Sequence, residues 1–291
     1  MIASKGSFFV LGAALCWSTM GCVQSLFSAF GASPVVTGFV RMGVGGLALA
    51  GWCALRGRLP RRDGWPLLNL LICVAALVAY QVFFFQGTIM AGVAVGTTVA
   101  IGAAPIFAAV ISAIVFHEKP VRAWYPATAL AILGIGLINW TGGEVNVATL
   151  VLPLLAALCY GINLNGWKTL TKRHHPDTVM MVIFLCCAVV MLPMLAFEER
   201  VSWLLTPRGW FFLAYMGIVT AALPFVLMLE GLRSTAPSTA GTLGLAEPMG
   251  ATFLGLVFLA EPLSAQAAAG VACILASALL LVLLPDLRWR H

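Results

Sequence analysis

The sequence has 291 residues, of which 62% are hydrophobic and only 9% are charged. Soluble domains carry about 25% charged residues, so water is not the solvent for most of this chain. The formal net charge is +6, but the basic residues lie between apolar runs and form no patch among polar residues. This distribution is typical of a membrane protein, and it argues against a nucleic-acid partner.

Ten apolar runs follow one another along the chain, each long enough to cross a bilayer. A bilayer core needs about 20 apolar residues per helix, and helices of this length satisfy their own backbone groups in lipid. Pro34, Pro66, Pro120 and Pro207 lie at the boundaries of these runs, where proline starts or blocks a helix. The sequence therefore predicts ten transmembrane helices, over residues 7–28, 34–55, 66–89, 94–116, 123–141, 148–168, 178–197, 209–231, 238–259 and 265–284.

The basic residues are distributed unevenly between the two ends of these spans. The side that holds the N-terminus also holds every Lys and Arg except Arg200 and Arg208, on the opposite side, and Arg41, within a span. Cytoplasmic loops of membrane proteins carry an excess of Lys and Arg. Both termini are therefore expected in the cytoplasm.

Several motifs recur at a constant distance of 143 residues. Ala-Ala-Leu-Cys at 13–16 returns at 156–159, and Pro105 and Glu118 return as Pro248 and Glu261. A shared offset at distant places indicates a tandem duplication. Because residues 1–143 contain five spans, the second unit, 144–291, crosses the membrane in the opposite sense. The expected fold is one all-α integral membrane domain, with two inverted five-helix repeats around a central cavity, as in many secondary transporters.

Aromatic and amide side chains lie deep in the first, third and sixth spans. Spacings of three, four or seven residues place them on shared helix faces. The 143-residue offset relates Trp17 to Tyr160. Together they would form an apolar cavity with a few polar groups, as ligand sites do. The alternative is an aromatic core in which the amides hydrogen-bond between helices and Trp167 lies at the membrane interface. These residues are Trp17, Tyr160, Gln24, Tyr80, Phe84, Asn163 and Trp167.

Two charged residues lie well inside predicted spans, away from their ends, where a charge is costly and needs a partner. Arg41, in the second span, could pair with a carboxylate of the protein or of a substrate. It could also cap backbone carbonyls or extend to the interface. Glu247 precedes Pro248, which is expected to break the ninth span near Leu243 or Gly244. Its carboxylate could carry a proton or bind an amine, or it could hydrogen-bond the freed backbone.

Catalytic and metal-binding patterns are missing from the spans. All three aspartates and all four histidines lie in loops or at helix ends, so no catalytic set or metal cluster can be placed at depth. The eight cysteines lie in or beside apolar runs, as small buried hydrophobes do. We therefore expect no enzyme activity, no metal and no cofactor. The scarcity of buried cations also argues against phosphorylated substrates.

The ten spans, the stretch 13–18, Phe39-Val40-Arg41 and the segments 105–118 and 248–261 together resemble the EamA branch of the drug/metabolite transporter superfamily. The chain looks most like the YddG-type exporters of aromatic amino acids. That resemblance implies ten helices arranged as a basket around a central cavity. It also implies export of aromatic, and of other neutral, amino acids across the bacterial inner membrane.

The leading hypothesis is therefore a secondary transporter that exports such amino acids by alternating access. Trp17, Tyr80 and Tyr160 would stack on the substrate, Asn163 and Gln24 would hydrogen-bond it, and Arg41 would attract its carboxylate. One alternative is export of another neutral metabolite or a drug by the same fold, and another is a membrane-embedded assembly protein. The expected partners are a small molecule, the lipid bilayer and, if Glu247 is coupled, protons. A monomer is compatible with the sequence, which leaves the oligomeric state open.

Overall fold

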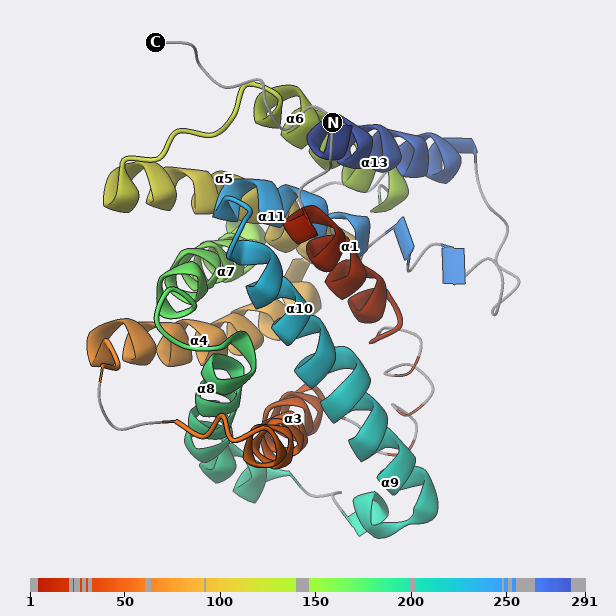
Figure 1. The fold of residues 1–291 in the computed structure, drawn as a ribbon. Helices are drawn as coiled ribbons and strands as arrows, with labels where there is room; N and C mark the ends of the chain where they lie inside the picture. Colours follow the sequence, from red (N-terminus) through yellow and green to blue (C-terminus); the bar gives the residue numbers. More distant parts are fainter. Residues whose placement is uncertain are drawn as a thin grey trace.

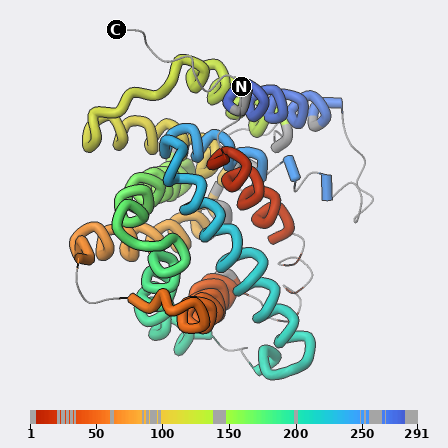
Figure 2. Tube along the Cα trace, in the orientation of Figure 1, coloured from red at the N-terminus to blue at the C-terminus, as the bar shows by residue number. Residues whose placement is uncertain are grey.

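The computed structural model describes residues 5–20, 23, 27, 30, 33–60, 64–91, 93–139, 147–198, 202–247, 249–250, 253–254 and 265–283. The regular secondary structure in these ranges is all helical. Figures 1 and 2 show the helices crossing one another at varied angles in a single assembly. The first half contains α1 (Lys5–Ser18), α3 (Pro34–Leu55), α4 (Leu67–Ala91), α5 (Val93–Phe116) and α6 (Trp124–Asn139).

The second half begins with a 3₁₀ turn, η1 (Val147–Leu150), that leads into α7 (Val151–Leu170). Helix α8 (Pro176–Met191) continues as the 3₁₀ segment η2 (Leu192–Phe197). After η3 (Ser202–Leu205), one long helical stretch comprises α9 (Pro207–Ala214), the π-helical η4 (Tyr215–Ala222) and α10 (Leu223–Leu232). Helices α11 (Pro237–Gly244) and α13 (Ala265–Leu283) follow.

Helix starts agree with the local sequence signals. Pro34 and Pro207 are the first residues of α3 and α9, as the sequence predicts. The Ser33 hydroxyl accepts a hydrogen bond of 3.2 Å from the Val36 N–H, and Thr206 accepts one of the same length from Gly209. Such caps satisfy N–H groups that have no partner in the first helical turn.

Six described helical stretches are long and apolar enough to cross a bilayer: Val35–Leu55, Leu67–Phe84, Val99–Phe116, Ala148–Leu170, Pro176–Phe197 and Pro207–Leu232. They lie within the second, third, fourth, sixth, seventh and eighth predicted spans or overlap them closely. The apolar stretches Trp124–Leu137 of α6 and Ala268–Leu281 of α13 are shorter. The predicted first and ninth spans extend beyond the described residues, so the count of ten stays a prediction.

The distribution of side chains is that of a protein surrounded by lipid. Large apolar side chains such as Phe197 and Leu55 are 88% and 87% exposed. Buried polar groups, by contrast, join helices to each other. Thr128 and Thr242 share a hydroxyl hydrogen bond of 2.8 Å, and Trp124 donates to the Ser238 carbonyl at 3.1 Å. Interhelical hydrogen bonds of this kind hold helices together where lipid supplies no hydrophobic driving force.

Glycines bring selected helices into backbone contact. A Cβ atom on Gly161 of α7 would lie 2.8 Å from the Ala108 backbone nitrogen of α5. A Cβ atom on Gly45 of α3 would lie 2.8 Å from the Gly217 carbonyl oxygen of η4. Larger residues at either position would push the helices apart, so these glycines fix the spacing of the bundle.

The helices pack in pairs that repeat between the two halves. Helix α3 packs on α8, α4 on α7, α1 on α10, and α6 on α13, and Figure 1 shows these neighbours side by side. Under the offset of 143 residues, α1 corresponds to α7 and α4 corresponds to the stretch from α9 to α10. The contact of α4 with α7 is then equivalent to the contact of α10 with α1. Two units related by a two-fold axis would produce this pairing.

Candidate functional site

A cavity lies where helices from both halves converge. Its walls come from α1, α3, α4 and α5 of the first half, and from α7, α10, α11 and the residues just after α11 in the second. The volume open to the centres of water molecules is about 60 Å³. One water needs about 10–15 Å³ of such volume, so the cavity is narrow and has space for only a few waters. The lining comprises Trp17, Met20, Arg41, Leu77, Tyr80, Gln81, Ala100, Ile101, Tyr160, Phe225, Gly241, Gly244, Leu245 and Glu247.

Arg41 supplies the positive charge of the cavity. Its side chain projects from α3 and is only 6% exposed, so it does not extend to an outer interface. One terminal nitrogen, Nη2, donates a 3.0 Å hydrogen bond to the Thr220 carbonyl oxygen, while Nε has no hydrogen-bond partner. Thr220 lies in the π-helical η4, and π-helical turns often occur at functional sites. One edge of the guanidinium is thus held by the protein, and the group still has unused donors.

Glu247 supplies the negative charge. Helix α11 ends at Gly244 and Leu245 lies in a turn, so the helix break that the sequence predicts near Leu243 or Gly244 is confirmed. Glu247 follows this break and lines the cavity. It interacts electrostatically with Arg41, but the two side chains form no ion pair within 4.0 Å. The cavity therefore holds one cation and one carboxylate that are not joined directly.

Aromatic rings form a continuous wall beside these charges. The ring of Phe225 makes edge-to-face contacts with Trp17 at 5.1 Å and with Trp167 at 5.5 Å between centroids. Trp167 in turn contacts Tyr160 at 6.1 Å, and Tyr160 lies 5.7 Å from Tyr80. Trp17 projects from α1 and Tyr160 from α7, the two helices that the 143-residue offset relates.

The cavity lining includes Trp17, Arg41, Tyr80, Tyr160 and Glu247 of the residues proposed from sequence. Three others lie behind or beside it. Trp167 and Asn163 are both fully buried, and Asn163 donates to the Cys159 carbonyl of its own helix at 3.1 Å. Phe84 stacks on Tyr80 with 5.6 Å between ring centroids. Gln24 and Pro248 lie outside the described residues.

Several lining residues were not proposed from sequence as members of the site. Phe225, Leu77, Met20 and Gln81 all line the cavity, and the Phe225 ring contacts three other rings, those of Trp17, Trp167 and Phe184. Gln81 was adjacent to the proposed Tyr80. For Phe225 the sequence holds no signal, because phenylalanines of the same span also face outward, as the 55% exposed Phe211 does.

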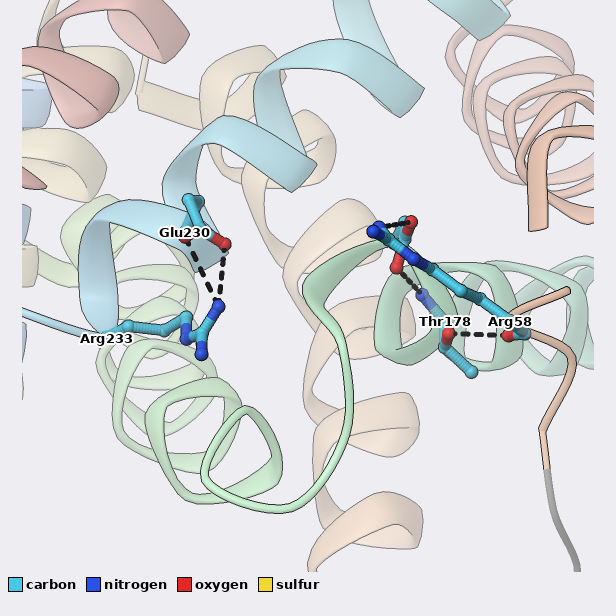
Figure 3. Close-up of polar contacts among 5 residues, drawn as sticks. Arg58, Thr178, Glu230 and Arg233 are labelled. Atoms are coloured by element: carbon cyan, nitrogen blue, oxygen red, sulfur yellow. Dashed lines mark hydrogen bonds and ion pairs between the residues drawn. The ribbon is translucent and has the colours of Figure 1, made fainter. Parts of the chain in front are cut away.

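Polar contacts lie at the end of the bundle that the distribution of Lys and Arg predicts to be cytoplasmic. Arg58 pairs with Asp177 at 3.1 Å, and the Thr178 hydroxyl donates to the Arg58 carbonyl at 2.8 Å (Figure 3). Figure 3 also shows the pair between Glu230 and Arg233, at 3.3 Å. The contacts of Arg58 join the segment after α3 to the start of α8, whereas Glu230 and Arg233 pair within the C-terminal turn of α10.

The charges and rings of the cavity suit the binding of a small molecule. Within the described ranges, no group of three or more His, Cys, Asp or Glu side chains could hold a metal ion. The cavity instead offers a cation, a carboxylate and an aromatic wall, which together suit a small molecule that carries both charges and an apolar part.

Comparison with known proteins shows the family of the chain. The sequence profile of the EamA-like transporter family matches residues 4–140 and again residues 147–283. The chain belongs to the EamA-like transporter family. The two matched segments begin 143 residues apart, at positions 4 and 147, which is the offset of the repeated motifs.

Individual members of the EamA-like family align over most of the chain. An uncharacterized transporter of Bacillus subtilis (strain 168), YwfM, is 35% identical over 286 residues, covering 96% of this chain and 94% of its own. The threonine/homoserine exporter RhtA of Escherichia coli (strain K12) is 28% identical over 248 residues, covering 83% and 78%. One solved crystal structure superposes with a TM-score of 0.82 at 21% identity and covers 97% of each chain, so the fold is one already observed. This protein is therefore a membrane transporter.

Proposed function

We propose that this transporter exports amino acids, and that the zwitterion binds between Arg41 and Glu247. The observation that carries the proposal is the presence of one guanidinium and one carboxylate, not paired with each other, in a cavity walled by aromatic rings. The α-carboxylate would meet the free donors of Arg41. The α-ammonium would meet Glu247. A sugar or an uncharged drug could hydrogen-bond to these groups but would neutralise neither charge, which makes the alternative of a neutral metabolite or drug exporter the weaker one.

The aromatic wall supports an aromatic side chain on the substrate. Trp17, Tyr80, Tyr160 and Phe225 present ring faces or edges to one space. Each aromatic pair contributes about 0.5–1.5 kcal/mol beyond the burial of apolar area. A cavity with space for only a few waters is small for a whole tryptophan, so we expect the halves to move apart when tryptophan binds. In alternating access, the two halves of a transporter move relative to each other around the substrate site in this way.

A small polar amino acid is the second candidate. The similarity to RhtA, a threonine/homoserine exporter, and the narrow cavity both favour it. Both candidates use the same two charges, and they differ only in what the aromatic wall contacts.

The proposed architecture is that of ten helices, in two inverted repeats over residues 1–143 and 144–291, in the bacterial inner membrane. The paired helix contacts and the doubled family match support it. The distribution of Lys and Arg supports cytoplasmic termini. A fluorescent protein fused to the C-terminus, which matures only in the cytoplasm, tests the orientation, and absence of fluorescence in a fusion that reaches the membrane would contradict it.

Counterflow into proteoliposomes tests the substrate. We expect labelled tryptophan to accumulate against unlabelled tryptophan inside, and we expect tryptamine and indole-3-propionate, which each lack one charge, to compete poorly. Threonine in place of tryptophan tests the second candidate. Equal competition by tryptamine would show that the carboxylate is not recognised. Absence of saturable flux with every amino acid, in a folded preparation, would refute the proposal.

A further inference from the structure

An apolar groove lies on the outer surface of the bundle, away from the central cavity. Its volume is about 440 Å³, which falls within the roughly 300–1,000 Å³ of small-molecule sites. Several of its side chains are about half exposed, including Trp52 at 47% and Ile218 at 45%, so the groove opens outward. Its walls are formed by Ala48 and Trp52 of α3, Ile218 and Ala222 of η4, and Leu223 and Val226 of α10.

The groove results from a change in side-chain size along one helix contact. Gly45 and Gly217 bring α3 and η4 into backbone contact. One turn further along α3 lies Ala48, and Ala222 lies a similar distance along η4. These two methyl groups fill little space, so a furrow remains between the larger side chains of Trp52 and Ile218.

One end of the groove is positively charged. The Arg56 guanidinium lies over the Trp52 ring, 4.5 Å from its centroid. Asp177 also lines the groove, but its carboxylate is balanced by Arg58 at 3.1 Å. Arg56 forms no ion pair with any residue that the structure describes. The rim therefore carries one net positive charge beside an apolar furrow.

We propose that this groove binds an anionic phospholipid, with an acyl chain along the furrow and the phosphate at Arg56. The charge at the rim is complementary to a phosphate. Arg56 follows α3 at the end that the Lys and Arg distribution places in the cytoplasm, where the leaflet is anionic. Trp52 has the interfacial position that membrane proteins favour for tryptophan. A furrow that faces hydrocarbon is filled by lipid, so the specificity of the site comes from the headgroup.

Native mass spectrometry of the full chain, released from detergent with added phosphatidylglycerol or phosphatidylcholine of the same acyl chains, tests the proposal. We expect phosphatidylglycerol to be retained in preference to phosphatidylcholine. Arg56→Gln should lower the apparent affinity for phosphatidylglycerol about fivefold, which corresponds to about 1 kcal/mol for one basic residue near the surface. Arg208→Gln is the matched control, because Arg208 also lies over an aromatic ring, that of Phe30 at 5.6 Å, away from the groove.

A second pair of variants tests the furrow itself and does not depend on the charge. Ile218→Trp should fill the groove and reduce lipid retention, whereas Leu47→Trp, at a 66% exposed position of α3 outside the groove, should not. Equal retention of both lipids, or retention unchanged by Arg56→Gln and Ile218→Trp, would overturn the proposal. So would a dimer that Ile218→Trp dissociates, because the groove would then accommodate a second copy of the chain.

Discussion

Replacing Phe225 with alanine should strongly destabilise the protein, because this ring joins three others. Phe225 is 5% exposed and lies 5.1 Å from both Trp17 and Phe184, and 5.5 Å from Trp167, in edge-to-face geometry. The three contacts together contribute about 1.5–4.5 kcal/mol. Phe→Ala substitutions at buried sites generally cost about 3–5 kcal/mol. The two ranges overlap, and we expect a loss of about 4 kcal/mol.

The free energy of unfolding can be measured by titrating the protein in mixed micelles with a denaturing detergent. Phe225→Leu removes the aromatic contacts, but the leucine side chain keeps most of the packing, so its loss should be near the lower end of the aromatic range, about 1.5–2 kcal/mol. Phe197→Ala is the matched control, since this ring is 88% exposed and its removal should have little effect. A loss below about 1 kcal/mol for Phe225→Ala, or one equal to that of Phe197→Ala, would show that the aromatic wall is not a packed unit.

Three further substitutions test the charged residues. Glu247→Gln should reduce counterflow, because a neutral amide pairs only weakly with the substrate ammonium, and it should abolish the response of flux to a pH gradient, because the amide cannot exchange a proton. Arg41→Lys should reduce substrate flux at least about tenfold, since an ammonium cannot hold the η4 carbonyl and a carboxylate in one plane and a charged hydrogen bond contributes about 1.5–3 kcal/mol. Asp177→Asn should lower the free energy of unfolding by about 1 kcal/mol at low salt and by less at high salt, because Arg58 is 40% exposed and solvent screens the pair.

Each of these outcomes has a result that contradicts it. A pH response that survives in Glu247→Gln would show that this carboxylate does not carry the coupled proton. Full flux in Arg41→Lys would show that only a positive charge is needed at this position. The same loss at low and high salt in Asp177→Asn would mean that packing, and not the charge, accounts for the effect. Glu230→Gln serves as the control for the last, since its pair with Arg233 is exposed on both sides.

Hydropathy and proline positions located the helices well, for a physical reason. A helix in lipid must be apolar over most of its length, so the ends of an apolar run indicate the ends of the helix. Residues 34–55 were expected to be helical, and α3 extends from Pro34 to Leu55. The π-helical η4 was not foreseeable, because a widened turn depends on packing against α3 through Gly45 and Gly217. The sequence offered a backbone carbonyl as one possible partner of Arg41, but it could not identify the carbonyl of Thr220.

Sequence reasoning located the site less completely, because helix faces are hard to distinguish in lipid. In a soluble protein polar residues mark the outer face, whereas here both faces are apolar. Residues that break the apolar pattern were found: Arg41, Glu247, Trp17 and Tyr160 all line the cavity. Phe225 does not break the pattern. Trp167 and Asn163 share a helix with Tyr160, yet both are fully buried and neither lines the cavity.

The separation of Arg41 from Glu247 is the strongest physical reason to expect a charged ligand. A buried charge is costly unless it is paired, and leaving one partner alone in a buried pair costs about 3–5 kcal/mol. The simplest way to lower that cost would be to join the two side chains, but Arg41 is instead held by the Thr220 carbonyl of η4. A zwitterion placed between them would pair both charges at once. The free energy gained by pairing both charges would then favour a ligand that carries an anionic and a cationic group over one that carries a single charge.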